Sequence, residues 1–227
     1  MDTRAPQLLP GKLYSYVVTH DTGFAPNPFF GYCTLACCKP TIRRNADLGN
    51  WIVGLAPKAM GNTVVYYMRV DAILDSFGDY WRDPRFTIKK PRFDSDVEFK
   101  CGDNIYEPRP SREYRQIRSM HSLRRGNEED TETKAHDLSG ERILVSETFA
   151  YFGGNAVPLP PELQDLVVGR AHKCRFSTGV MDEFLRFVKK RGLGGMRSTP
   201  RTWPPDDDSC VKRCDCPTKA RFPTSRF

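Results

Sequence analysis

Apolar positions along this chain follow two periods, one typical of strands and one typical of helices. The strand-like runs, rich in β-branched and aromatic residues and bounded by turn residues, are Leu13 to Thr19, Trp51 to Leu55, Thr63 to Val70 and Arg142 to Ser146. Asp71 to Trp81 and Met181 to Arg191 instead repeat apolar residues at helical spacing. Because strands outnumber helices without regular alternation, we predict an α+β fold around a mainly antiparallel sheet with a few peripheral helices.

The pattern ends near Gly195. From there to Phe227 the chain mixes Pro, Arg, Asp, Cys and Ser with scattered apolar residues. Such a segment buries too little apolar surface to offset the entropy lost on ordering. We therefore expect a single folded domain at residues 1–194 and a disordered tail at residues 195–227.

Composition narrows the class of protein. The chain has 227 residues, 39% of them hydrophobic, and lacks both a run of about 18 apolar residues and the apolar stretch of a secretory signal. We expect a cytoplasmic protein that does not bind membranes, with its eight cysteines as reduced thiols. The net charge of +7 permits a nucleotide or nucleic acid as partner without requiring one.

Candidate chemistry is densest from Asp21 to Gly54. In its GFAPNPFFGYC stretch, prolines and glycines shape a loop whose backbone can approach a ligand, and the Asn27 amide offers a donor and an acceptor on one edge, which suits a nucleobase. Lys39 and Arg43 would hold phosphate. The alternatives are a rigid structural turn and a solvated basic edge.

Cysteines in this segment allow a second chemistry. Cys33 or Cys37 could be a nucleophile, since Lys39 and Arg43 nearby would lower a thiol pKa, although buried packing is the commoner role of a cysteine. The C-x3-C-C spacing lacks the second ligand pair of a zinc site. We predict no metal and no cofactor.

A second polar cluster follows at Gly102 to Tyr106 and continues to His121. Asp103 or Asp137 could pair with His121 as a general base, because a carboxylate fixes an imidazole tautomer and raises its basicity. Gly-Asp-Asn is also an ordinary turn sequence, and a loop histidine is often only solvated. A single site requires this cluster to face the Asp21 to Gly54 segment.

Five strings along the chain resemble the nucleotide modification associated domain 2 family. They are DTGFAPNPFFGYCTLACCKPTIR, GNWIVG, GDNIY, the S-x-H-S of Ser119 to Ser122, and ILVSETFAYFGG, in an order that spans about Leu13 to Lys190. The matching positions are Asp21, Asn27, Pro28, Cys33, Thr34, Cys37, Lys39, Pro40, Arg43, Gly102, Asp103, Asn104, Tyr106, His121 and Ser122. Asn50 departs from the acid expected in the GDWIVG pattern.

This resemblance implies a role near enzymes that modify nucleic-acid bases, which become possible partners. The order of elements also resembles small barrels of the PUA and ASCH kind, so we expect a partly barrel-like sheet. Our first hypothesis is a nucleotide- or base-binding domain in a DNA base-modification pathway, in which Asn27 and Asp103 read the base. Lys39 and Arg43 hold phosphate, and further ligand contacts come from Asp21, Thr34, Asn104, Tyr106 and Ser122. The alternatives are a transferase or hydrolase that uses Cys33, Cys37, Asp103 or His121, and a plain interaction protein.

Overall fold

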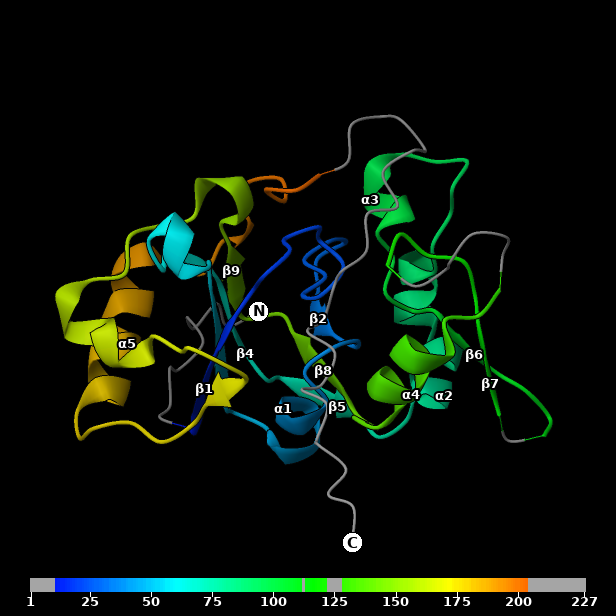
Figure 1. The fold of residues 1–227 in the computed structure, drawn as a ribbon, viewed down its shortest axis with the longest axis horizontal. Helices are drawn as coiled ribbons and strands as arrows, with labels where there is room; N and C mark the ends of the chain where they lie inside the picture. The colour runs from blue at the N-terminus through cyan, green and yellow to red at the C-terminus, as the bar shows by residue number, and fades with distance from the viewer. Residues whose placement is uncertain (1–10, 112, 122–127, 204–227) are drawn as a thin grey trace, which may run out of the picture.

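The computed structural model describes residues 11–111, 113–121 and 128–203, and its largest element is a six-stranded sheet (Figure 1). Its order is β10-β1-β3-β4-β9-β11. The strands are β1 (Leu13–Val17), β3 (Trp51–Leu55), β4 (Val64–Arg69), β9 (Phe149–Tyr151), β10 (His172–Lys173) and β11 (Gly195–Met196). The β1/β3 and β9/β11 pairs are parallel and the other pairs are antiparallel.

Both faces of this sheet are covered, which explains its nearly continuous apolar strands. Helix α5 (Val180–Arg191) and the 3-10 helix η4 (Pro161–Leu166) pack on one face, where Tyr67 meets Phe184. Tyr66 points to the other face and packs with Cys33 and Leu35. Side chains alternate along a strand, so these neighbouring tyrosines face opposite ways, yet both are fully buried.

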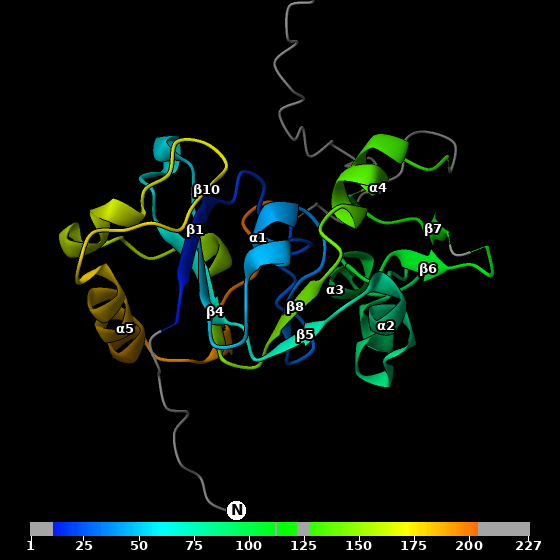
Figure 2. The same cartoon turned by 90° about the horizontal axis from the view of Figure 1, so that it is seen from below.

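A three-stranded antiparallel sheet forms the next layer. Its order is β2-β8-β5, from β2 (Cys33–Leu35), β8 (Ile143–Ser146) and β5 (Ala72–Leu74), and the short helix α1 (Pro40–Asn45) follows β2. Leu144 faces the large sheet, whereas Ile143 and Val145 belong to a separate apolar cluster on the far side. In Figures 1 and 2 this layer lies in the middle of the molecule.

The far side carries short elements and a two-stranded sheet (Figure 2). These are α2 (Phe77–Arg82), η2 (Pro84–Lys89), α3 (Val97–Lys100), β6 (Tyr106–Pro108), β7 (Tyr114–Gln116) and α4 (Thr131–Leu138). Two further 3-10 turns, η1 (Lys58–Met60) and η3 (Gly153–Asn155), flank β4 and β9 along the chain. The α+β class and the mostly antiparallel pairing are therefore confirmed.

Three expectations differ from the structure. The large sheet ends at β10 and β11 and is not closed by any described strand, so the barrel-like closure expected from PUA and ASCH domains is not confirmed. Ile73 and Leu74 belong to β5, and the helix starts only at Phe77, where the Ser76 hydroxyl caps it. Residues 195–203, expected in the tail, continue the fold through β11, while residues 204–227 lie outside the described part.

Candidate functional site

The two polar segments expected to face each other do meet. The Thr34 hydroxyl donates to Asp103 Oδ2 at 2.6 Å, and the Cys37 thiol lies 3.7 Å from the Asp103 carbonyl oxygen. Further along, Cys38 Sγ lies 3.7 Å from His121 Nε2. The residues between β2 and α1 thus contact both ends of the Asp103 to His121 segment.

Asp103 lies beneath this region and is fully buried. Its two carboxylate oxygens accept hydrogen bonds from Thr34 and from the Tyr80 hydroxyl, each at 2.6 Å. Burial raises the pKa of Asp103, while the nearby Lys89 ammonium lowers it. With both oxygens engaged inside the protein, Asp103 joins β2 to the α2 region.

Asn27 is also buried, and its amide is already used. Asn27 Nδ2 donates to the Cys101 carbonyl at 3.0 Å, and Oδ1 accepts from Lys89 Nζ at 2.5 Å. Lys89 donates as well to the Asn27 and Tyr32 carbonyls at 3.1 and 2.9 Å. Here the amide edge expected to read a base holds the loop closed around a buried ammonium group.

Asn104 and Tyr106 complete the buried set. Asn104 Nδ2 donates to the carbonyls of Tyr80 and Phe86 at 3.0 and 3.2 Å. The Tyr106 hydroxyl donates to Asp137 Oδ2 at 2.8 Å. Both side chains face the protein interior, so their hydrogen bonds fix the backbone around the site.

Arg43 is fully buried beneath the β2–α1 turn. Its guanidinium group donates to the carbonyls of Cys38 at 2.9 Å, Arg142 at 2.8 Å and Asp137, and lies 5.3 Å from the centre of the Phe77 ring. We expected this residue to hold phosphate. Its donors instead satisfy three backbone carbonyls.

Asp137 holds the same turn from the other side. Its Oδ1 accepts from the Cys38 backbone N–H at 2.6 Å while Oδ2 accepts from Tyr106. The general-base pairing considered for His121 with Asp103 or Asp137 would need a direct hydrogen bond. His121 Nδ1 is buried and has no hydrogen-bond partner among the described residues.

The turn that Arg43 and Asp137 hold is strained. Cys38 and Lys39 both have left-handed backbone conformations, with φ of 59° and 43°. For residues other than glycine, such conformations cost about 1–3 kcal/mol each and persist only where surrounding contacts impose them. The result is a partly exposed thiol next to a partly exposed ammonium group, whose Nζ lies 4.8 Å from the centre of the Tyr16 ring.

His121 faces this thiol from the second segment. Its ring stacks on Phe24 with the centroids 4.4 Å apart and the planes 20° apart. Burial lowers the pKa of His121 below its usual 6.5, against the opposing effect of the nearby Asp137 carboxylate. The neutral imidazole is therefore favoured, and neutral Nε2 can accept the thiol proton.

The other described cysteines lie in less reactive surroundings. Burial raises the pKa of Cys33 to about 12 and raises that of Cys37 above its ordinary value, so both side chains stay protonated at neutral pH. Cys33, Cys37, Cys38, Cys101 and Cys174 form no disulfide with one another. Of the two expected nucleophiles, neither reaches the surface, whereas their neighbour Cys38 does.

Asp21 has a structural partner at the other end of the chain. Its Oδ1 accepts from the Tyr151 hydroxyl, and Oδ2 accepts from the Arg201 backbone N–H at 3.0 Å. Burial raises the pKa of Asp21. Ser122 lies outside the described residues.

Cys38 is the residue that reasoning from sequence missed. The string CCKP contained a usable signal, because a proline that starts a helix with four residues between it and the preceding strand marks a short strand-to-helix turn. Turns of that kind present the nucleophile in α/β-hydrolases. Lys89, in contrast, has no local signal, since its partners lie 57 to 62 residues away.

In the described part of the chain, no three His, Cys, Asp or Glu side chains are grouped so that they could hold a metal ion. Within the same residues no helix has the length and apolar character needed to cross a membrane. Comparisons with curated proteins and with solved structures gave no match. A family model matches residues 11–206, and the chain therefore belongs to the nucleotide modification associated domain 2 family.

Proposed function

We propose that this protein is a nucleotide-modifying enzyme in which Cys38 is the nucleophile and His121 accepts its proton. The observation that carries the proposal is the 3.7 Å contact between Cys38 Sγ and His121 Nε2 at a strained, partly exposed turn. Strained residues cluster at functional sites, and a thiol beside an imidazole is the common arrangement of a cysteine nucleophile. Membership of a nucleotide modification family supports nucleotides or nucleic acids as substrates.

The proposed reaction starts from a protonated Cys38 thiol and a neutral His121 imidazole. As the Cys38 sulfur bonds to an electrophilic carbon or phosphorus of the substrate, His121 takes the thiol proton and then gives it to the leaving group. Water attacking this intermediate makes the protein a hydrolase, and another acceptor makes it a transferase. Either attack releases the sulfur, and the proton of the attacking group returns through His121 to restore the thiol.

Lys39 is the cation best situated to attract a substrate phosphate. It directly follows Cys38, it is partly exposed, and its ammonium group is a compact point charge. Arg43 is engaged with three backbone carbonyls, so its role is to hold the turn. A phosphate bound by Lys39 would bring the rest of a nucleotide to the thiol.

Alkylation kinetics test the nucleophile. The protein is treated with chloroacetamide at pH 7, and each cysteine peptide is followed by mass spectrometry, with the partly exposed Cys174 as internal reference. Cys38 is expected to react about tenfold faster than Cys174, because its imidazole neighbour accepts the thiol proton. Equal rates at the two positions would contradict the proposal.

The pH dependence identifies the imidazole. Since burial lowers the pKa of His121, the neutral base persists below pH 6.5, and the fast reaction of Cys38 should decline only at lower pH. Four neighbouring titratable groups also shift the pKa of His121, namely Asp137, Asp130, His136 and His20. They are the same in the wild-type protein and in the variant below. His121→Gln should remove the fast reaction and its acid limb while leaving the Cys174 rate unchanged. An unaltered Cys38 profile would exclude His121 as the base.

A binding role without catalysis is the second candidate. It is favoured by an aromatic pocket at the other end of β2, described below. Cys38→Ser in a cellular modification assay separates the two roles. Loss of the modification supports the enzyme, and full retention supports the binding domain.

A further inference from the structure

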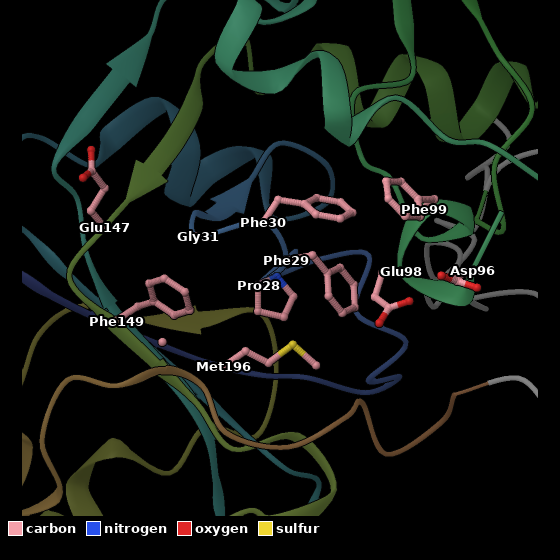
Figure 3. A pocket seen from close by; sticks show the side chains of 11 residues that line it. Pro28, Phe29, Phe30, Gly31, Asp96, Glu98, Phe99, Glu147, Phe149 and Met196 are labelled. Atoms are coloured by element: carbon pink, nitrogen blue, oxygen red, sulfur yellow. The ribbon is translucent and has the colours of Figure 1, made fainter.

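A pocket of about 430 Å³ opens beside the loop that precedes β2 (Figure 3). The loop supplies Phe29 and Phe30, α3 and its start supply Asp96, Glu98 and Phe99, and the turn between β8 and β9 supplies Glu147. Its volume falls in the range of about 300–1,000 Å³ typical of small-molecule sites. None of Cys38, Lys39 and His121 is among the residues that line the pocket, so the pocket is distinct from the thiol site.

Aromatic rings form the pocket's main walls. The rings of Phe30 and Phe99 have centroids 4.9 Å apart at 34°, and Phe29 stands 6.1 Å from Phe30 at 53°. Phe29 is in turn backed by Trp203, whose ring is nearly parallel to it at 6.2 Å. These surfaces offer flat faces for stacking a planar ring.

Phe30 has an additional peculiarity. Its backbone is left-handed, with φ of 61°, and Gly31 follows with φ of 81°. A bulky residue in this conformation is a genuine outlier, and such strain is often kept at ligand clamps. The strained turn leaves the Phe30 ring partly exposed at the pocket in Figure 3 rather than packed in the core.

The ionisable side chains that line the pocket are all acidic, and the Arg92 guanidinium lies outside the lining, 4.1 Å from the centre of the Phe99 ring. Asp96, Glu98 and Glu147 contribute carboxylates, and no Lys or Arg is among the described residues that line it. Glu98 and Phe29 both line the pocket (Figure 3). Ionised carboxylates only accept hydrogen bonds and repel phosphate, so the favoured ligand is planar, offers N–H donors and carries no negative charge inside the pocket.

We infer that this pocket binds a nucleobase carrying an exocyclic amino group, base first, with the sugar and phosphate outside. The choice of a base over other planar ligands rests on the proposed action on nucleotides. The pocket itself is a second site, separate from the one at Cys38. Phe30 stacks the ring, and Glu98 accepts from the amino group. A carboxylate accepting from the cytosine amino group is an established mode of base recognition.

A matched pair of nucleosides tests this inference, because deoxycytidine and deoxyuridine differ only at position 4 and in the ring proton beside it. Binding is followed by NMR titration of the full chain up to about 10 mM, which captures the millimolar affinities of small ligands. At the resonances of Phe30, Phe99 and Glu98, deoxycytidine should bind about fivefold more tightly than deoxyuridine, and deoxycytidine triphosphate no more tightly than the nucleoside. Resonances of Cys38 and Lys39 report binding at the thiol site separately. Equal binding of the pair, tighter binding of the triphosphate at the pocket resonances, or no saturation there would overturn the inference.

Variants assign the binding to the pocket. Phe30→Ala should weaken deoxycytidine binding about tenfold, as expected for loss of one stacking ring, and Glu98→Gln should abolish the preference over deoxyuridine. Leu48→Ala and Glu162→Gln, outside the pocket, are the matched controls. Tetramethylammonium tests the competing occupant of an aromatic, acidic pocket, and its binding in place of the nucleosides would refute a base site.

The proposals for the pocket and for the thiol can be contradicted independently of each other. Cys38→Ala should bind deoxycytidine normally, and Phe30→Ala should keep fast alkylation of Cys38. Fast alkylation without nucleoside binding would overturn only the pocket inference. Nucleoside binding without a reactive Cys38 would overturn only the proposed thiol mechanism.

Discussion

At the scale of single residues, the polar side chains of this protein divide into a buried group and an exposed group. Asn27, Asp103 and Lys89 lie inside: Asn27 and Lys89 hydrogen-bond each other and backbone carbonyls, and Asp103 accepts from two buried hydroxyls. Cys38 and Lys39 lie on a turn that reaches the surface. Buried, satisfied polar groups fix one conformation, and here that conformation includes the strained turn.

Lys89 makes the buried group sensitive to pH. Burial lowers its pKa from 10.5 to about 8. Between these values the unfolded chain holds the proton and the native protein has lost it, so stability contributed at this residue rises with pH by up to about 1.4 kcal/mol per unit. Lys89→Met should lack this rise in urea unfolding measured from pH 7.5 to 9.5.

The informative quantity is the difference in the free energy of unfolding between the wild-type protein and Lys89→Met at each pH. Buried thiols such as Cys33, with its pKa raised to about 12, act in the opposite direction, because the unfolded chain loses their protons first. These thiols are present in both proteins, so their contribution to the pH dependence cancels in the difference. Parallel stability curves for the two proteins would show that Lys89 keeps an ordinary pKa.

The sequence predicted that the candidate polar residues lie together better than it predicted their contacts. Asn27, Asp103 and His121 were singled out, and they lie in one region of the fold. Whether an amide meets a ligand or a lysine 62 residues away depends on tertiary packing, which has no local signal. Adjacent cysteines likewise gave no indication of which one turns outward.

At the scale of elements, the conformation of the turn at Cys38 and Lys39 depends on how α1 sits against the end of α4. Arg43 of α1 extends under the turn to carbonyls at and beyond the end of α4. Gly140, just after α4, leaves the room for it, because a Cβ there would lie 2.2 Å from Arg43 Nη2. The packing tolerates no side chain at this position.

Gly140→Ala should therefore lower the free energy of unfolding by about 1–3 kcal/mol, as overpacking of a close contact does. Because the guanidinium group must move, the same variant should slow alkylation of Cys38. Gly169→Ala is the control, since a Cβ at Gly169 meets nothing within 4 Å. Equal urea midpoints for the two variants would contradict the close packing.

Element types were predictable where a pattern was long and uniform. The strands β1, β3, β4 and β8 and the helix α5 match predicted runs, because alternation or helical spacing persists through each. The predicted helix from Asp71 failed in its first half, where Ile73 and Leu74 pair with β8 instead. Pairing with a distant strand outweighed the local helical spacing.

At the scale of the whole molecule, the last described residues lock the first loop. Gly195 and Met196 pair in parallel with β9, and the Thr202 N–H donates to the Asp21 carbonyl at 2.8 Å. Arg201 adds its hydrogen bond to the Asp21 carboxylate. The expected tail boundary at residue 194 came from scattered apolar residues, and backbone pairing of this kind requires no apolar side chains.

Truncation tests this lock. A chain ending at residue 194 should unfold at a lower temperature than one ending at residue 206, because it loses β11 and both contacts to Asp21. The chain ending at residue 206, which keeps all the residues matched by the family model, is the control. Calorimetric midpoints that coincide would mean that residues 195–203 contribute nothing to stability.

The contact of Asp21 with Arg201 also orders events during synthesis. The two residues are 180 positions apart, and ribosomes add about 5–20 residues per second, so the loop waits roughly 9–36 s for its partner. Throughout that interval the nascent chain carries a first loop, with Asn27 and Phe30, that lacks its final closure. Factors that shield newly made chains would meet this protein with its pocket unfinished, and closure of the first loop is therefore coupled to synthesis of the segment around Arg201.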